Sequence, residues 1–184
     1  DIIRGGRFAR VKELSGSCKL DEEVGSEQMI ASMCLALALY HEARGEPHYG
    51  QLMVARVIVN RVQSKNFPDS ICDVVMQPRQ FSFVRDGKFP KPKDESSWQS
   101  SQDLAAEIVK DVRVLPYSAA DHYHALKVKP VWRKDLHEVT QVGSHVFYSR
   151  KDPSTLLGKI RPKSRPESLV KPEQFSFVRW LGLL

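Results

Sequence analysis

The sequence predicts an α+β domain that is mainly helical and carries a small β element. Apolar residues recur at three- and four-residue spacing through the first part of the chain, which is typical of amphipathic helices. From Ala119 onward the pattern changes to short alternating segments, which are typical of strands. With 184 residues, 41% of them hydrophobic, the chain is long enough for one domain with a substantial core.

Composition divides the chain into three segments. Residues 1–25 are mixed and polar with several glycines, and we expect them to form an N-terminal arm on the surface. Residues 26–149 contain the predicted helices and strands and form the folded domain. Residues 150–184 begin as a basic, proline-rich connection, typical of an extended chain, and end in a segment that we expect to dock.

The first predicted helix begins at Ser26, which is a suitable N-cap. Residues 33–40 are apolar almost all round, apart from one tyrosine hydroxyl, and such a helix is usually buried on most sides. The helix should end near Arg44, because Gly45 suits a C-terminal cap and Pro47 cannot continue a helix.

Three further helices are predicted from apolar patterning and turn residues. One runs from about Gly50 to Gln63 and has few polar positions. A short one follows the turn at Phe67-Pro68, from Ser70 to Val75, and Pro78 ends it. The last spans Trp98–Val112 and is amphipathic.

Short strands are predicted after residue 119, and Gly143-Ser144 favours a hairpin turn between the last two. The strand segments lie at Tyr123-His124, Val128, Val131-Trp132, Val139–Val142 and Val146–Tyr148.

One hexapeptide occurs twice. Gln80–Arg85 and Gln174–Arg179 have the same sequence, QFSFVR, and each follows a proline. One interpretation is a coincidence between two aromatic strand segments. The other is that the C-terminal copy docks where a partner segment would bind, which would allow self-association through the repeat.

The three cysteines are Cys18, Cys34 and Cys72, and none forms a close pair of the kind that binds zinc or exchanges disulfides. Cys34 lies in an apolar run and is interpreted as a core residue. Cys18 and Cys72 are able to form a bridge in an oxidising compartment, so the cysteines leave the compartment undecided.

The charge balance is basic: 28 Lys and Arg face 22 Asp and Glu, a net charge of +6. Such a protein is attracted to polyanions, and nucleic acid, anionic membranes and bacterial walls all qualify. No apolar run approaches the roughly 20 residues needed to span a bilayer, and no signal-peptide pattern opens the chain.

The residues that point to chemistry are those of His41–Pro47, where two carboxylates and a histidine follow an apolar helix. A carboxyl group at the end of a buried helix is partly desolvated, which raises its pKa. The negative potential of a helix C-terminus acts in the same direction. A carboxylic acid that is neutral near pH 7 is what glycosidic bond cleavage requires. Arg44 would oppose this effect by pairing with either glutamate, and an ordinary charged helix end in solvent is the alternative interpretation.

The sequence resembles the SleB/CwlJ family of cell-wall hydrolases, which includes the spore cortex-lytic enzymes. The likeness covers roughly residues 29–149. The motifs that carry it are His41–Pro47, Gly50-Gln51, Val59–Val62, Phe67-Pro68, Gln77-Pro78 with Gln80–Ser82, Ala120–Ala125, Pro130 with Trp132, and Gly143–Tyr148.

The resemblance implies a mainly helical α+β catalytic domain, over residues 26–149, distantly related to lysozymes and lytic transglycosylases. It implies that Glu42, the first glutamate of the Glu-Ala-Arg-Gly-Glu motif, is the essential acid. The substrate would be the bond between N-acetylmuramic acid and N-acetylglucosamine, cleaved as by a muramidase or lytic transglycosylase. Neither a metal nor another cofactor is implied, and no nucleic-acid partner is expected. The implied place of action is the cell envelope, or outside the cell for a phage lysin.

Further residues have weaker indications. The possible supporting residues are Glu46, Arg44 and His41, of which Glu46 either assists Glu42 or holds the turn. The possible substrate-binding residues are Gln51, Asn60, Gln80, Phe81, Ser82, His122, Tyr123 and His124. Gln51 and Asn60 bind sugar amides or cap backbone groups, and the Gln80–Ser82 segment lines a glycan groove or is a packed strand. His122 and His124 should share one face of a strand.

Two other functional classes remain open from the sequence. His41, His122, His124 and His145, with Glu42 or Asp121, supply enough donors for a zinc-dependent wall hydrolase, although no His-Glu-x-x-His spacing occurs. A non-catalytic module that binds walls or nucleic acid is compatible with the basic tail and its interleaved aromatic residues.

Overall fold

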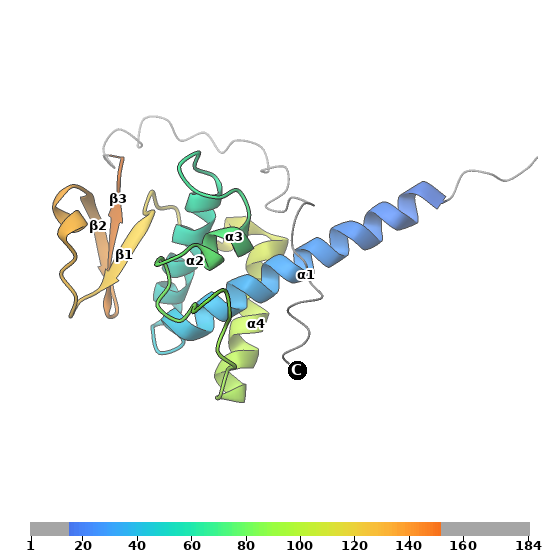
Figure 1. Cartoon of the computed structure of the whole chain (residues 1–184), viewed down its shortest axis with the longest axis horizontal. Coiled ribbons are helices and arrows are strands. Elements are labelled where there is room, and N and C mark those ends of the chain that lie inside the picture. Colours follow the sequence, from blue (N-terminus) through green and yellow to red (C-terminus); the bar gives the residue numbers. More distant parts are fainter. Residues whose placement is uncertain (1–14, 152–184) are drawn as a thin grey trace, which may run out of the picture.

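The structure is a computed structural model of the chain, and it describes the backbone of residues 15–151 and the side chains of residues 25–151. Within this part, four α-helices lie beside a small antiparallel sheet (Figure 1). The helices are α1 (Ser15–Ala43), α2 (His48–Val62), α3 (Ile71–Met76) and α4 (Glu95–Lys110). The strands are β1 (His122–Ala125), β2 (His137–Val142) and β3 (His145–Ser149), with 3-10 helices at Val112–Val114 (η1) and Val131–Lys134 (η2). The predicted α+β, mainly helical class is confirmed.

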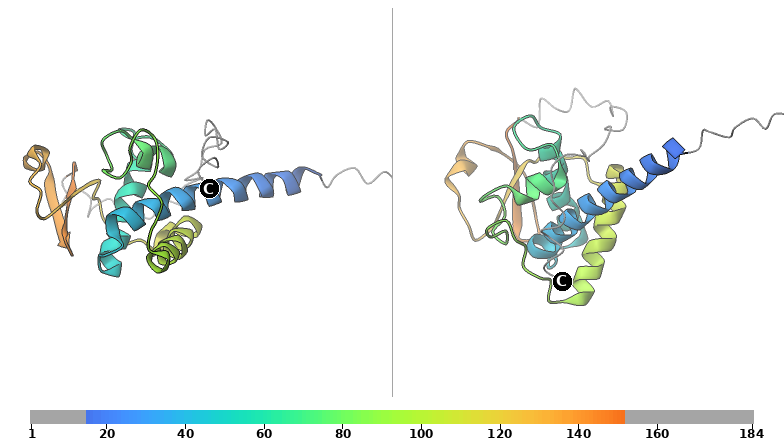
Figure 2. Two further views of the ribbon diagram at one scale, coloured as in Figure 1. Left: turned by 60° about the horizontal axis from the view of Figure 1, so that its bottom comes forward. Right: turned by 45° about the vertical axis from the view of Figure 1, so that its right-hand side comes forward.

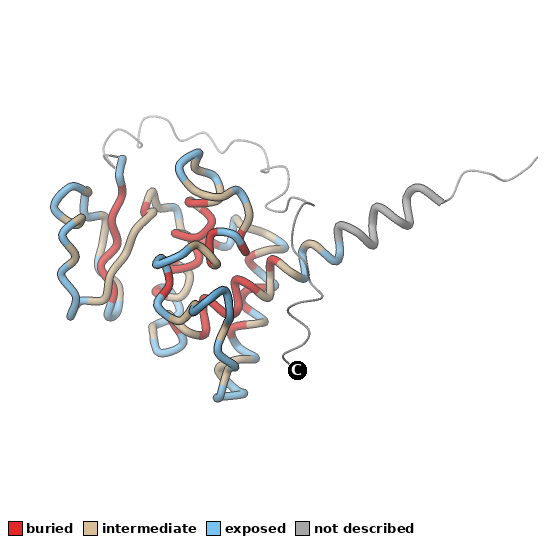
Figure 3. Tube along the Cα trace, in the orientation of Figure 1, coloured by how far each residue is buried: buried red, intermediate tan, exposed pale blue. Residues whose placement is uncertain are grey.

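The core lies where the second half of α1 meets the other three helices. Residues 34–40 of α1 are buried all round, as their uniformly apolar sequence predicts. Buried positions accumulate along this part of α1 and on α2 and α3 (Figure 3). The sheet adds Phe147 to the same core, so the helices and the sheet are joined by apolar contact.

The predicted start of the first helix at Ser26 is wrong, because α1 begins at Ser15 and Ser26 lies inside it. Residues 15–25 of the expected arm are therefore helical. They contain no proline, and each of their two glycines, Gly16 and Gly25, costs a helix only about 1 kcal/mol, so nothing in this stretch stops the helix. The predicted end is confirmed: α1 stops at Ala43, and the Glu46 amide donates a 2.9 Å hydrogen bond to the Ala43 carbonyl across the turn.

The other helices agree with the sequence to within a few residues. α2 begins directly after Pro47, two residues earlier than expected. Ser70 caps α3, accepting a hydrogen bond from the Asp73 amide. Asp94 caps α4 in the same way through the amide of Ser97.

The sheet has the order β1-β3-β2, and both pairs are antiparallel. The predicted hairpin between β2 and β3 is confirmed, with Gly143 at a φ of 56° in the turn. The predicted strands at Val128 and Val131-Trp132 are wrong: Val128 lies in a loop and Val131 begins the 3-10 helix η2 after Pro130. Pro130 lacks an amide proton and cannot donate to a strand ladder, which favours this outcome.

The strand interpretation of Gln80–Arg85 is also wrong, because this segment forms a series of turns. Arg79 precedes it at a φ of 65°, which interrupts an extended chain. The second copy of the hexapeptide, with the rest of the 150–184 segment beyond Lys151, lies outside the described residues. The division of the chain into arm, folded domain and docking tail stays a prediction.

Cys34 of α1 and Cys72 of α3 form a disulfide. The interpretation of Cys34 as a plain core residue is therefore wrong in part, since it is buried but bonded, and Cys72 does not pair with Cys18. The bond closes a loop of 38 positions and ties the longest helix to the short one. No helix in the described part is long and apolar enough to cross a membrane.

Candidate active site

Glu42 lies in the last turn of α1, half-buried, where the apolar helix ends. Its Oε2 accepts a 3.1 Å hydrogen bond from the hydroxyl of Tyr123 on β1. Burial raises the pKa of Glu42 above its ordinary value of 4.5, and the hydrogen bond from Tyr123 acts in the opposite direction to a smaller extent. The result is a carboxyl group that favours its protonated form but keeps some contact with solvent, as a proton donor to an incoming substrate must.

Tyr123 reaches Glu42 from the opposite layer of the molecule. Its ring packs edge-on against His145 at 5.1 Å and at a tilt against Phe147 at 5.7 Å, both on β3. Burial, and the neighbouring Glu42 carboxyl, raise the pKa of Tyr123 well above its usual value of 10.0. The hydroxyl therefore stays protonated and serves as a fixed donor to Glu42. Of the predicted substrate-binding residues, Tyr123 is the one with a direct hydrogen bond to Glu42 in the described part.

Glu46 is held by the β2–β3 hairpin. The Ser144 amide donates a 2.9 Å hydrogen bond to Glu46 Oε2, and the Ser144 hydroxyl donates to Oε1. The nearest imidazole nitrogen, His145 Nδ1, is 3.6 Å from Oε1. Burial alone would raise the pKa of Glu46, but the two Ser144 hydrogen bonds and His145 outweigh it and lower this pKa. Glu46 therefore stays ionised and joins the turn after α1 to the sheet.

Two neighbours make this attachment possible. A side chain at Gly143 would collide with the Glu46 carboxylate and with Pro47, and its φ of 56° is one that few residues other than glycine adopt. Gln51 donates from Nε2 to the backbone carbonyl of Glu46 at 3.1 Å. Of the two roles considered for Gln51, this geometry matches the capping of a backbone group.

Arg44 and His41 point away from the two glutamates. The Arg44 guanidinium lies over the Tyr40 ring, 4.7 Å from its centroid, and the ion pairs of residues 25–151 include none from Arg44 to Glu42 or Glu46. Arg44 therefore does not form the ion pair that would favour the ionised form of Glu42. His41 donates through Nε2 to the Pro90 carbonyl at 3.1 Å and stacks on Phe83 at 4.7 Å, so it anchors the loop before α4.

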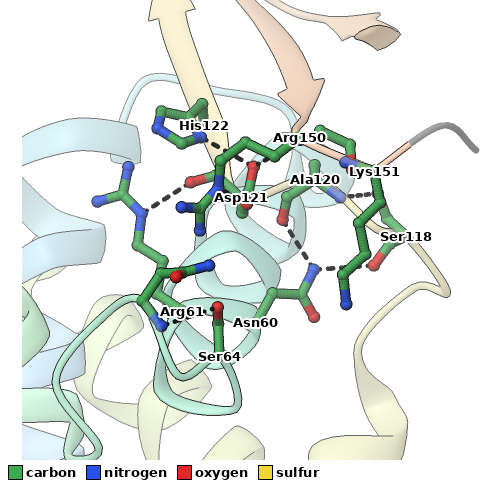
Figure 4. A network of polar contacts seen from close by, with 11 residues as sticks. Asn60, Arg61, Ser64, Ser118, Ala120, Asp121, His122, Arg150 and Lys151 are labelled. Atoms are coloured by element: carbon green, nitrogen blue, oxygen red, sulfur yellow. Dashed lines mark hydrogen bonds and ion pairs between the residues drawn. The ribbon is translucent and has the colours of Figure 1, made fainter. Parts of the chain in front are cut away.

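Asn60 and Arg61 attach the end of α2 to the start of β1 (Figure 4). Asn60 Nδ2 donates to the carbonyls of Ser118 and Ala120, at 2.8 and 2.7 Å. Arg61, which is buried, donates from Nε to the Asp121 carbonyl at 2.8 Å. Asn60 is thus occupied with backbone groups, which matches its structural rather than its sugar-binding interpretation.

His122 and His124 share one face of β1, as the alternation of a strand predicts. Their rings lie 5.3 and 5.7 Å from the ring of Trp132, and His124 also stacks on Tyr148. This is the opposite face from Tyr123 and Glu42. Successive residues of a strand point to opposite faces, so Tyr123 faces Glu42 and the two histidines face Trp132. The substrate-binding role of His122 and His124 stays a prediction.

The contacts described for the Gln80–Ser82 segment do not include Glu42. The Phe81 ring is 2% exposed and belongs to the core, which leaves it no free face for a sugar. Gln80 and Ser82 are exposed at the surface. In this segment the packed interpretation applies to Phe81, while Gln80 and Ser82 remain predicted substrate-binding residues.

The side chains proposed for a zinc site are not gathered in the described part. His41 lies against Phe83, His145 lies beside Tyr123, and the other two histidines face outward beneath Trp132. Among residues 25–151, whose side chains the structure describes, no group of three or more His, Cys, Asp or Glu could hold a metal ion.

Ser144 and Arg61 are the site neighbours that sequence reasoning missed. Ser144 was recognised as part of a hairpin turn and of a family motif but was given no role, and its contact with Glu46 joins positions 98 apart in the chain. The available signal was the Gly143-Ser144 pair, because a glycine in a turn often permits close approach of another group. Arg61 gave a weaker signal, as a charged residue in an apolar helix.

Comparisons with known proteins show which family the chain resembles. A profile of the family described as Cell Wall Hydrolase matches residues 45–148, which include Glu46, Tyr123 and Ser144 and begin three positions after Glu42. Spore cortex-lytic enzymes from Oceanobacillus iheyensis and Bacillus cereus are 34% and 33% identical over 61% of this chain, but over only 39% and 42% of their own lengths. The chain thus spans about two fifths of the length of the curated relatives it matches.

A solved structure provides the comparison of folds. The catalytic domain of the germination-specific lytic transglycosylase SleB from Bacillus anthracis superposes with a TM-score of 0.51 at 30% identity. The superposition covers 67% of this chain and 95% of that domain. The helices and the three-stranded sheet described above therefore correspond to one nearly complete catalytic domain.

Proposed function

This chain belongs to the cell wall hydrolase family, and we propose that it cleaves the glycan strands of peptidoglycan between N-acetylmuramic acid and N-acetylglucosamine. The observation that carries the proposal is the half-buried Glu42, whose pKa is raised by burial and whose Oε2 is held by Tyr123. The names of the similar proteins support the substrate class, since they are cortex-lytic enzymes and a lytic transglycosylase.

In the proposed reaction, Glu42 enters as a carboxylic acid. It gives its proton to the oxygen that links the two sugars, and the bond from that oxygen to C1 of the muramic acid breaks. Positive charge builds on the sugar ring, and the newly formed Glu42 carboxylate lies beside it. The Tyr123 hydroxyl stabilises this carboxylate by donating to Oε2, which leaves Oε1 for the substrate.

The second step closes the reaction without water. The C6 hydroxyl of the same muramic acid attacks C1, its proton passes to Glu42, and a 1,6-anhydro ring forms. Glu42 is again protonated and ready for another strand. One carboxyl group therefore suffices. Glu46 does not compete for the role, because the hydrogen bonds from Ser144 lower its pKa and keep it ionised.

The experiment compares wild type and Glu42→Gln on purified sacculi. We expect wild type to release anhydro-muropeptides, detected by mass spectrometry, and the variant to keep its fold and lose at least about a hundredfold in rate, as removal of a general acid does. Near-normal turnover by Glu42→Gln would falsify the role of Glu42. Products with reducing ends would show that water, and not the C6 hydroxyl, attacks C1, so that the reaction is a hydrolysis. Tyr117→Ser, an exposed substitution outside the site, is the matched control.

Action in the cell envelope follows from this substrate. The Cys34–Cys72 disulfide supports it, because such bonds persist in oxidising compartments outside the cytoplasm. A phage lysin, made in the cytoplasm and then released to act outside the cell, is the alternative. A thiol assay of protein isolated from the source cells distinguishes the two, since a bonded pair supports the envelope and free thiols at both positions support the lysin.

A further inference from the structure

The segment that leaves β1 and enters η2, residues 126–134, exposes an unusual concentration of apolar side chains. Leu126, Val128 and Val131 are 43%, 54% and 83% exposed, and they are three of the seven exposed large apolar residues within positions 25–151. Single exposed residues of this kind are ordinary on a protein surface, but three within six positions indicate a contact surface.

The same segment is strongly basic. Basic residues are interspersed among the apolar ones: Lys127, Lys129, Arg133 and Lys134. The segment 126–134 contains no acidic residue. The three lysines are exposed. Apolar and cationic groups are thus presented together over nine positions, and we refer to residues 126–134 as the basic-apolar loop.

The basic-apolar loop is anchored on the side of the sheet that faces away from the helices (Figures 1 and 2). At its start, the Leu126 amide donates to the Ser144 carbonyl and the Val128 amide donates to the Ala125 carbonyl, both at 2.8 Å. At its end, the Trp132 ring packs between His122 and His124. These contacts fix the loop while leaving the Val131 side chain in solvent.

We propose that the basic-apolar loop binds the surface of an anionic lipid membrane. A soluble polyanion, such as nucleic acid or a charged wall polymer, would engage the lysines and leave Val128 and Val131 in water. A lipid surface engages both kinds of group, because phosphate headgroups attract the lysines and the acyl boundary takes up the apolar side chains. The proposal is independent of glycan cleavage, since the loop lies on the opposite face of the sheet from Glu42.

The test is flotation of the full chain with vesicles of phosphatidylglycerol mixed with phosphatidylcholine. Wild type should float with these vesicles, less so at high salt, and should not float with pure phosphatidylcholine. Val128→Ser/Val131→Ser should bind at least about tenfold more weakly, because two apolar side chains no longer enter the lipid. Lys127→Glu/Lys129→Glu should also lose binding. Tyr117→Ser, 65% exposed but outside the loop, should bind as wild type does.

Three results would overturn the proposal. The first is an absence of flotation by wild type. The second is equal flotation by wild type and Val128→Ser/Val131→Ser, with unchanged circular dichroism, which would show that charge alone is responsible. The third is retention on a soluble polyanion such as heparin without binding to vesicles. Glu42→Gln should float like wild type, so a failure of the proposed catalysis leaves this test intact.

Discussion

The Tyr123 hydroxyl, carried by the sheet, donates a 3.1 Å hydrogen bond to the Glu42 carboxyl at the end of α1, 81 positions earlier in the chain. Two opposing influences act on Glu42 as a result. Burial favours the neutral acid, whereas the Tyr123 hydrogen bond favours the carboxylate. A group that must give and then regain a proton benefits from both, because neither protonation state is strongly excluded.

Tyr123→Phe should keep the fold and slow glycan cleavage. A hydrogen bond to a charged group contributes about 1.5–3 kcal/mol, which corresponds to a loss of about ten- to a hundredfold in kcat. Without this hydrogen bond the pKa of Glu42 rises further, so the decline of activity at high pH should move to higher pH. A pH–rate profile on solubilised glycan strands measures both effects. Tyr117→Phe, at a tyrosine that is 65% exposed, is the matched control, and an unmoved profile in Tyr123→Phe would argue against the assigned contact.

Glu42→Gln should become more stable than wild type as the pH rises. The pKa of Glu42 is raised in the folded protein, so the folded state holds its proton more tightly than the unfolded state does. This contribution to stability is present below the unfolded value of 4.5 and is lost as the pH rises through the folded pKa. Denaturant melts of both proteins from pH 4 to pH 8 measure the difference. A difference that is constant with pH would contradict the raised pKa.

Glu46→Gln and Gly143→Ala should each destabilise the junction between the turn after α1 and the sheet. The first weakens two hydrogen bonds to a carboxylate, and the second places a methyl group against it, so each should cost about 1–3 kcal/mol. Because the pKa of Glu46 is lowered, its contribution is present above 4.5 and disappears as the pH falls through the folded pKa. The effect of Glu46→Gln should therefore vanish in acid. Costs that add fully in the double variant would indicate that the two positions do not interact.

Reduction of the Cys34–Cys72 bond should lower the free energy of unfolding. A cross-link between residues 38 positions apart lowers the conformational entropy of the unfolded chain, which adds about 3–4 kcal/mol to the free energy of unfolding. Thermal melts with and without reductant measure this loss. Cys72→Ser should match the reduced protein and no longer respond to reductant. Cys18→Ser should respond as wild type does, and loss of the response in that variant would point to a different pairing.

Asn60→Ala should detach the segment before β1 from α2. Two carbonyls lose their donor, at a cost of about 1–3 kcal/mol in the free energy of unfolding. Hydrogen exchange should rise in β1 more than in the core of α2, because the lost contacts lie between them. Lys65→Ala, which is exposed, is the control. An increase in exchange that is uniform over all elements would indicate a global effect instead.

The sequence predicts those features that depend on neighbouring residues. The end of α1 follows from Gly45 and Pro47, and the cap of α3 follows from Ser70, because each acts on the residues beside it. The features that were missed depend on contacts between distant positions. Cys34 and Cys72 belong to different helices, and no local pattern indicates which cysteines meet. Glu42 and Tyr123 were both named as candidate site residues, but the contact between them depends on the register of a strand that lies across the fold.

The start of α1 and the segment at Val131 show two other limits. Ser26 resembles an N-cap, but a good capping residue also fits inside a helix when nothing before it ends the helix. Val131 has a high strand propensity, yet the preceding Pro130 cannot donate to a strand ladder and instead precedes the 3-10 helix η2. Intrinsic preferences of one residue are weak compared with the geometry of its neighbours.

The small sheet that carries Tyr123 sets the working lifetime of the site. Three short strands have little stability of their own, and this sheet persists because Phe147, Arg61 and Asn60 attach it to the helices. The arrangement around Glu42 therefore lasts only as long as the sheet stays docked. Substitutions that weaken this junction should therefore shorten the lifetime of the active arrangement under heat.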